Sequence, residues 1–217
     1  MLKVTKVKCV SSVGVICLLA ACGGGSVSNQ EFVDSVIDRA EQIDTDFIEG
    51  QNALPLSELP RVGPATYSGV SYAVGGIGNP DEDTEELRIL FLGNLELSVD
   101  LNEDTITGVA DNFVEIENVA DLDLDDEEFA DPVAGGDVSG QLDITGDLSS
   151  DAIASFDVSV TGSLEAESGA NLNFGAVEGS ATVFGSDAEV IDLFAGTLVN
   201  DFDNQDGFIG VFGVAQK

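Results

Sequence analysis

The sequence predicts an all-β domain of about eight or nine antiparallel strands, preceded by one amphipathic helix. From residue 65 onward, apolar residues alternate with polar ones, as half-buried strands require. Clusters of Asn, Asp, Ser and Gly separate these segments at short intervals, without an intervening helical pattern. Such an arrangement closes into a barrel or stacks as a sandwich. Single glycines inside the strands favour the barrel, because its tight coiling needs them.

Residues 1–21 resemble the signal peptide of a bacterial lipoprotein. Three lysines precede an apolar stretch over residues 9–19, which is too short to span a bilayer as a helix. The stretch ends in Leu19-Ala20-Ala21-Cys22, which is similar to the lipobox of that class. The similarity implies that Cys22 carries lipid on its thiol and becomes the first residue after cleavage. An ordinary secretory peptide, with Cys22 near its cleavage site by chance, is the alternative.

The region 22–64 would then hold the lipidated cysteine, a tether, a helix and a connector. Gly23-Gly24-Gly25-Ser26 has the composition of a flexible tether. The helix is predicted over residues 28–47, where Ser28 and Glu31 match a capping box. Its apolar residues recur at three- and four-residue spacing: Phe32, Val33, Val36, Ile37, Ala40, Ile43 and Phe47. The helix would pack on the following domain, close one end of it, or act only as a spacer.

The domain predicted over residues 65–217 contains several strand patterns. Alternation is clearest over residues 95–101, 138–148 and 156–160. The other predicted strands are residues 65–74, 86–93, 104–117, 170–184, 188–199 and 207–214. The turns expected between strands are residues 78–81, 102–104, 149–151, 185–187 and 204–207.

Residues 118–136 interrupt the strand pattern with a run of acids. The acids are Asp121, Asp123, Asp125, Asp126, Glu127, Glu128 and Asp131. Like charges at this density repel one another in a flat sheet, so we predict a long mobile loop. Loose binding of divalent cations is the alternative. A second acidic motif, Asp201-x-Asp203-x-x-Asp206-Gly207, departs from the EF-hand spacing by one residue, and a hairpin turn explains it more simply.

Several short motifs follow one another along residues 65–217. They are Ala65-Thr66-Tyr67-Ser68-Gly69, Leu97-Ser98-Val99-Asp100-Leu101 with Ile106-Thr107-Gly108, Val177-Glu178-Gly179 with Val183-Phe184-Gly185, Ala188-Glu189 with Phe194-Ala195-Gly196-Thr197, and Gly210-Val211-Phe212-Gly213. In this order they resemble the β-barrel domain of the transferrin-binding-protein-B-like surface lipoproteins. The resemblance implies an antiparallel, up-and-down β-barrel of about eight strands, preceded by the lipoprotein signal peptide and the amphipathic helix.

Two departures from this family limit what the resemblance implies about function. The full receptors have two lobes, each with a barrel and a handle domain, whereas residues 65–217 accommodate one barrel. Haem-carrying relatives imply axial ligands, but after residue 21 the chain has neither His nor Met. Tyr67 and Tyr72 remain, and both are expected to pack or hydrogen-bond in the first strand. The resemblance therefore implies fold and location, and iron acquisition only weakly.

Charge and composition exclude several functions. The chain has 41 Asp and Glu against 7 Lys and Arg, a net charge of −34, which becomes −37 without residues 1–21. Nucleic acid is excluded as a partner because phosphate binding needs clustered cations. Without histidine, Ser-His-Asp and Cys-His catalysis are excluded. A carboxylate hydrolase would need two inward-pointing acids in an apolar pocket, and no Trp is present to stack a sugar. We expect no enzyme, no cofactor and no metal ion.

These features predict a lipid-anchored protein of the bacterial outer membrane or cell surface. It would be a monomer that displays one barrel for capture of a protein or small-molecule ligand, with recognition by loops at the barrel rim. Nutrient or iron-source acquisition is one such role. The charge would steer a basic partner or serve only to keep the protein in solution. The alternative function is that of a structural envelope lipoprotein without a soluble ligand.

Overall fold

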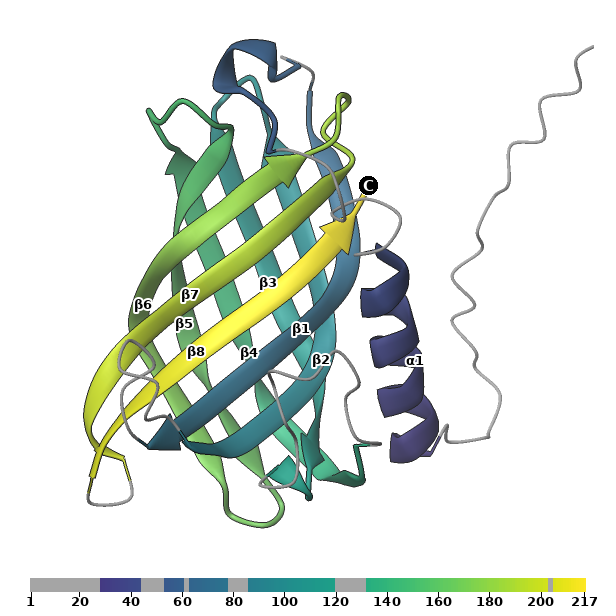
Figure 1. Cartoon of the computed structure of the whole chain (residues 1–217), viewed down its shortest axis with the longest axis vertical. Coiled ribbons are helices and arrows are strands. Elements are labelled where there is room, and N and C mark those ends of the chain that lie inside the picture. The colour runs from purple at the N-terminus through teal and green to yellow at the C-terminus, as the bar shows by residue number, and fades with distance from the viewer. Residues whose placement is uncertain (1–27, 44–52, 61–62, 78–85, 120–131, 203–204) are drawn as a thin grey trace, which may run out of the picture.

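The computed structural model describes residues 28–43, 53–60, 63–77, 86–119, 132–202 and 205–217. Within these ranges, eight strands form a closed antiparallel barrel in sequence order (Figure 1). The strands are β1 (Ala65–Ile77), β2 (Glu86–Asp100), β3 (Thr105–Ile116), β4 (Ala134–Leu148), β5 (Ser155–Ala166), β6 (Asn171–Phe184), β7 (Val190–Phe202) and β8 (Gln205–Gln216). The helices are α1 (Asn29–Ile43) and the short 3-10 helix η2 (Leu56–Glu58).

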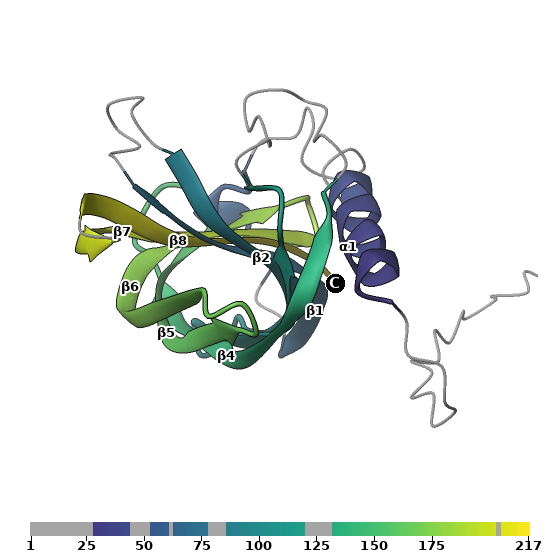
Figure 2. The ribbon, with the colours of Figure 1, turned by 90° about the horizontal axis from the view of Figure 1, so that it is seen from below.

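Pairing between the first and last strands closes the barrel. Ser68 of β1 pairs with Gln216 of β8, and the register continues to Ile77 and Gly207. Figure 2 shows the ring of strands from below, with α1 outside it. The predicted all-β class and the up-and-down barrel are therefore confirmed, and the sandwich alternative is wrong. Among the described strands, closure leaves no unpaired sheet edge.

The barrel interior is a packed apolar core. Alternation along each strand sends every second side chain inward. The largest buried aromatic residues are Tyr67, Phe91, Phe113, Phe156 and Phe174, and aliphatic side chains from all eight strands fill the space between them. Among the described residues, the buried polar side chains are Ser71, Ser149 and Ser155. The described interior therefore holds neither a carboxylate pair nor a ligand-sized polar site.

The segment that contains η2 covers one end of the barrel. The Leu54 amide donates to the carbonyl oxygen of Val183 (2.9 Å), and the Ala154 amide donates to that of Leu54 (2.7 Å). The side chains of Leu54 and Leu59 are buried with the interior cluster. Part of the predicted connector thus belongs to the folded domain.

Helix α1 packs against the outside of the barrel. Its capping box is as predicted: the Ser28 amide donates to the Glu31 carboxylate (3.1 Å), and the Glu31 amide donates to Ser28 Oγ (3.2 Å). The buried side chains of the helix are Val33, Val36 and Ile43. They share one cluster with apolar side chains on the outer faces of β1 and β2. Packing on the domain is confirmed, while end closure and a free spacer are wrong. Residues 44–47 of the predicted helix lie outside the described residues.

The prediction of two strands over residues 86–93 and 95–101 is wrong, because both segments belong to β2. A β-bulge lies opposite the join, where Leu92 pairs with Val114 but Asn94 pairs with Asp111. At Gly93, a Cβ atom would lie 2.6 Å from the Phe113 ring. This glycine therefore makes room for an aromatic side chain and does not form a turn.

Two predicted loops are also shorter than expected. The loop was predicted over residues 118–136, but residues 134–136 belong to β4, so the predicted end of the loop is wrong. Residues 120–131 lie outside the described residues. The Asn29 side-chain amide donates to the carbonyl oxygen of Gly135 (2.8 Å), which joins this strand end to α1. Residues 205–207 belong to β8 and not to the predicted turn, because Gly207 pairs with both β1 and β7. The turn predicted over residues 78–81 lies outside the described residues.

Candidate functional site

The outer wall of the barrel is polar on one side and apolar on the other. The outward side chains of β3 to β6 are mainly Thr, Ser, Asn, Asp and Glu. On the other side, β7, β8, β1 and β2 present Phe194, Leu198, Phe212, Val214, Val70, Tyr72, Leu90 and Leu92. Helix α1 covers part of this apolar wall and leaves the rest open to water. A contiguous exposed apolar surface is typical of an interaction site.

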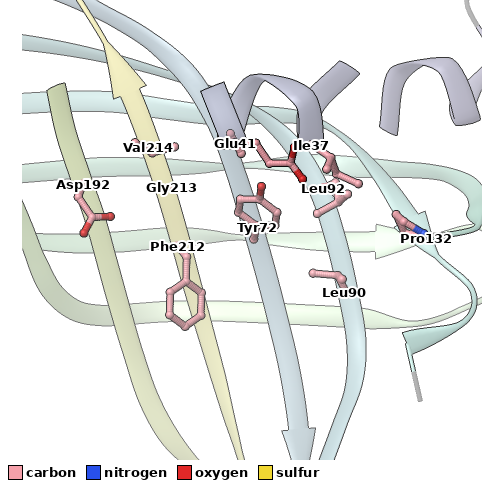
Figure 3. Close-up of a pocket in the computed structure, with 11 residues that line it drawn as sticks. Ile37, Glu41, Tyr72, Leu90, Leu92, Pro132, Asp192, Phe212, Gly213 and Val214 are labelled. Atoms are coloured by element: carbon pink, nitrogen blue, oxygen red, sulfur yellow. The ribbon is translucent and has the colours of Figure 1, made fainter. Parts of the chain in front are cut away.

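A groove of about 320 Å³ separates one flank of α1 from the barrel wall (Figure 3). The lining side chains discussed below are Ile37, Ala40 and Glu41 of α1, Tyr72 of β1, Asp192 of β7 and Phe212 of β8. Its volume is at the lower end of the range for small-ligand sites. We refer to this recess as the α1 groove.

The α1 groove follows from the pattern of the helix. The most deeply buried stripe of α1 packs against β1, β2 and the adjoining ends of β3 and β4. Ile37, Ala40 and Glu41 lie on the flank that borders the groove. Because the Ala40 side chain ends at Cβ, this flank does not fill the space in front of β8. On the opposite side, Phe212 and Asp192 rise from β8 and β7 (Figure 3).

The chemistry of the α1 groove combines an apolar floor with an acidic rim. The side chains of Glu41 and Asp192 are exposed at its border. Burial, and then the Glu41 carboxylate, raise the pKa of Tyr72 to about 12, so its hydroxyl stays an uncharged hydrogen-bonding group. None of the basic residues in the described ranges lines the groove. The arrangement is suited to a group with an apolar body and a positive charge.

The apolar surface continues past the groove onto β7. The rings of Phe194 and Phe212 lie 5.1 Å apart between centroids, tilted by 46°, and these side chains are 49% and 42% exposed. Leu198, farther along β7, is 57% exposed. Single exposed apolar residues are common on proteins. These three side chains, however, lie next to the apolar α1 groove and extend its apolar surface. We call this surface, which consists of the two aromatic rings of Phe194 and Phe212 and the neighbouring Leu198, the aromatic strip.

The two tyrosines lie on opposite faces of β1. Tyr67 points into the core, where its hydroxyl donates to the carbonyl oxygen of Ala188 (2.7 Å), and burial followed by the Glu189 charge raises its pKa to about 12. Tyr72 points outward into the α1 groove. The prediction that each tyrosine packs or hydrogen-bonds in the first strand is confirmed. Because the barrel wall separates them, the two hydroxyls do not form a joint ligand set for one iron.

The other predicted site residues fall mostly outside the described residues. Cys22, Asp203 and residues 120–131 are among those, and so is the side chain of Asp201. Within the described part of the chain, no group of three or more His, Cys, Asp or Glu side chains is placed to hold a metal ion. No helix in that part has the length and apolar character needed to cross a membrane.

The residues of the α1 groove were not predicted from the sequence. A signal was nevertheless present in the first and last strands. Their outward positions carry no charged or amide side chain: Val70, Tyr72 and Val74 in the first strand, and Phe208, Gly210 and Phe212 in the last. A strand that is apolar on both faces predicts cover on its outer side. Here α1 provides part of that cover.

The two tyrosines make the free energy of unfolding fall with rising pH in the alkaline range. Unfolded tyrosine loses its proton near pH 10, whereas Tyr67 and Tyr72 hold theirs to about pH 12 in the folded protein. Their contribution to stability is therefore complete below pH 10 and is lost as the pH rises toward 12. Urea unfolding at increasing pH should show this decline, and the double variant Tyr67→Phe, Tyr72→Phe should show a shallower one. Parallel declines in both proteins would contradict this assignment.

The comparisons with known proteins find structural similarity only. No protein family profile matches the chain. No curated protein matches it either. Two similar crystal structures are of the vaccine antigen transferrin binding protein B from Haemophilus parasuis, one a double mutant and one a single mutant. The double mutant has a TM-score of 0.43 and 13% identity over 76% of this chain and 27% of its own. The single mutant has a TM-score of 0.42 and 14% identity over 76% of this chain and 28% of its own. The chain thus spans about a quarter of the length of these structures.

Proposed function

We propose that the protein is a lipid-anchored binding protein of the bacterial outer membrane or cell surface. Residues 1–21 act as the signal peptide, and the Cys22 thiol carries the lipid. Residues 22–64 supply the tether, helix and connector, and residues 65–217 form the barrel domain. The barrel is displayed for capture of a protein or small-molecule ligand, and no catalytic step or cofactor is involved.

The α1 groove with its aromatic strip is the observation that carries this proposal. Because apolar side chains fill the described interior, a ligand would bind on the outer wall, where the α1 groove is an apolar recess. The groove combines apolar lining, a hydroxyl group and carboxylates, which is the usual composition of a binding site. Recognition by rim loops and a role in nutrient or iron-source acquisition stay predictions, since much of the rim lies outside the described residues.

The anchor rests on the amino-acid sequence. The lipobox-like Leu19-Ala20-Ala21-Cys22 is followed directly by Gly23-Gly24-Gly25-Ser26, so a lipid on Cys22 would hold the domain by a flexible connection. Several acyl chains, at about 0.8 kcal/mol for each buried CH₂, retain a protein far better than one chain does.

Proteinase K treatment of intact cells distinguishes display from an inward-facing structural role. We expect the protease to reach the displayed chain and to release the barrel domain into the medium, while a periplasmic marker stays intact. The same treatment of cells with a permeabilised outer membrane provides the control for total susceptibility. Protection in intact cells together with cleavage after permeabilisation would contradict display and favour the structural envelope lipoprotein.

A further inference from the structure

We infer that the α1 groove and the aromatic strip together bind a segment of a partner protein that combines apolar side chains with lysine or arginine. This inference rests on the proposed function and specifies its ligand.

The length of the apolar surface favours a polypeptide segment over a small molecule. The groove ends at Phe212, but the exposed apolar surface continues through Phe194 to Leu198. Because these side chains lie on two neighbouring strands, an elongated occupant with several apolar groups would cover both the groove and the strip. A small ligand would fill the groove and leave the strip exposed.

The charges of the groove favour a basic occupant. Glu41 on the helix flank and Asp192 on β7 border the apolar lining. The basic residues in the described ranges are Arg39, Arg88 and Lys217. Arg39 donates to Ser68 (2.8 Å) and Arg88 pairs with Glu86 (2.9 Å). A partner that brings its own cations would therefore complement this surface, and the net charge of −37 that remains without residues 1–21 would speed its approach.

Two other occupants fit these observations less well. A second copy of this chain would bring an excess of acids and few cations to the acidic rim, so like charges would oppose the contact. A lipid bilayer would have to cover Asp192, which lies two residues before Phe194 on the same outward face of β7. Moving charged side chains such as Asp192 and the exposed Glu41 from water toward an apolar bilayer is costly.

A single tryptophan reports directly on the strip, because the natural chain contains none. In Phe212→Trp the indole replaces a half-exposed ring at the edge of the groove. The control Thr161→Trp places an indole at an exposed position on the polar wall of β5. The full chain is studied in phosphatidylcholine vesicles if it carries lipid, and in buffer if it does not. Peptide binding is then measured whether or not the chain carries a lipid anchor. A negative result for binding is therefore distinguishable from a negative result for the anchor.

The probe is a short synthetic peptide of alternating lysine and leucine. We expect it to shift the emission of the Phe212→Trp protein to shorter wavelength with saturation, and to leave the Thr161→Trp protein unchanged. Peptides with glutamate in place of lysine, or serine in place of leucine, should bind at least about tenfold more weakly. Glu41→Lys in the Phe212→Trp protein should weaken binding about tenfold. Glu178→Lys makes the same charge change on the polar wall and should leave binding nearly unchanged.

Several results would overturn the inference. Equal affinity for all peptides, absence of any shift, or equal losses in the Glu41→Lys and Glu178→Lys proteins would each do so. Quenching of the Phe212→Trp emission by brominated lipid chains would assign the strip to the membrane. Sedimentation that reveals a dimer abolished by Phe194→Ser would assign it to a second copy. Unchanged circular dichroism and melting temperature in each variant exclude misfolding as the cause.

Discussion

Cys22→Ser is expected to leave the barrel folded and to abolish its retention in the outer-membrane fraction. The proposed anchor depends on one thiol, because the lipid is attached through the sulfur atom. Each acyl chain contributes about 0.8 kcal/mol for every buried CH₂, so its loss removes most of the membrane affinity. The described part of the barrel core is formed by residues from Leu54 onward. Fractionation followed by immunoblotting measures the effect.

Cys17→Ser is the matched control, because it makes the same chemical change inside the predicted leader and leaves Leu19-Ala20-Ala21-Cys22 intact. It should fractionate like the natural chain. Outer-membrane retention of the Cys22→Ser protein, at the level of the natural chain, would contradict the anchor. The mass of each product separates a processed chain from an uncleaved precursor.

Gly162→Ala is expected to lower the free energy of unfolding by about 4 kcal/mol. Gly162 lies in β5 with a φ of +140°, a conformation that side-chain-bearing residues rarely adopt. A Cβ atom there would overlap the carbonyl oxygen of Gln141 on β4 and lie 3.1 Å from the Leu142 Cα. Both atoms belong to the main chain of a paired strand, so they move only if the β4–β5 pairing distorts. A loss of this size is a large share of the stability of an ordinary domain.

Gly175→Ala is the control for this change. Gly175 lies on β6, where a Cβ atom would have no neighbour within 4 Å and φ is not in the left-handed region. The free energy of unfolding of the Gly175→Ala variant should stay within about 0.5 kcal/mol of that of the natural chain. Urea unfolding followed by circular dichroism compares the three proteins. Equal stabilities for the two variants would show that close strand contact at Gly162 is not what requires glycine.

The sequence predicted most reliably those strands that have one face in the core and one in water. In β4, Val138, Leu142 and Ile144 point inward between polar residues, so alternation reveals the strand directly. In β2, the prediction ended one strand at Gly93 and began the next at residue 95, although this segment is continuous. Its glycine is required by the Phe113 ring on the neighbouring strand, a contact that no local pattern contains.

The candidate site was less predictable because tertiary packing creates it. The apolar stripe of α1 predicted that the helix would pack on something, but not on which surface. The outward Tyr72 and Val74 on β1 have no polar alternation to identify their face, since they lie under or beside the helix. The groove exists because α1 packs on β4, β1, β2 and β8 but hardly reaches β7, and that placement depends on contacts such as Arg39 with Ser68.

Mass spectrometry of the amino-terminal peptide, from full-length protein recovered in the outer-membrane fraction, tests the central claim most directly. A peptide that begins at Cys22, with a diacylglyceryl group on sulfur and an acylated amine, is the predicted result. An unmodified Cys22, or a mature chain that begins at another residue, would contradict a lipid-anchored barrel.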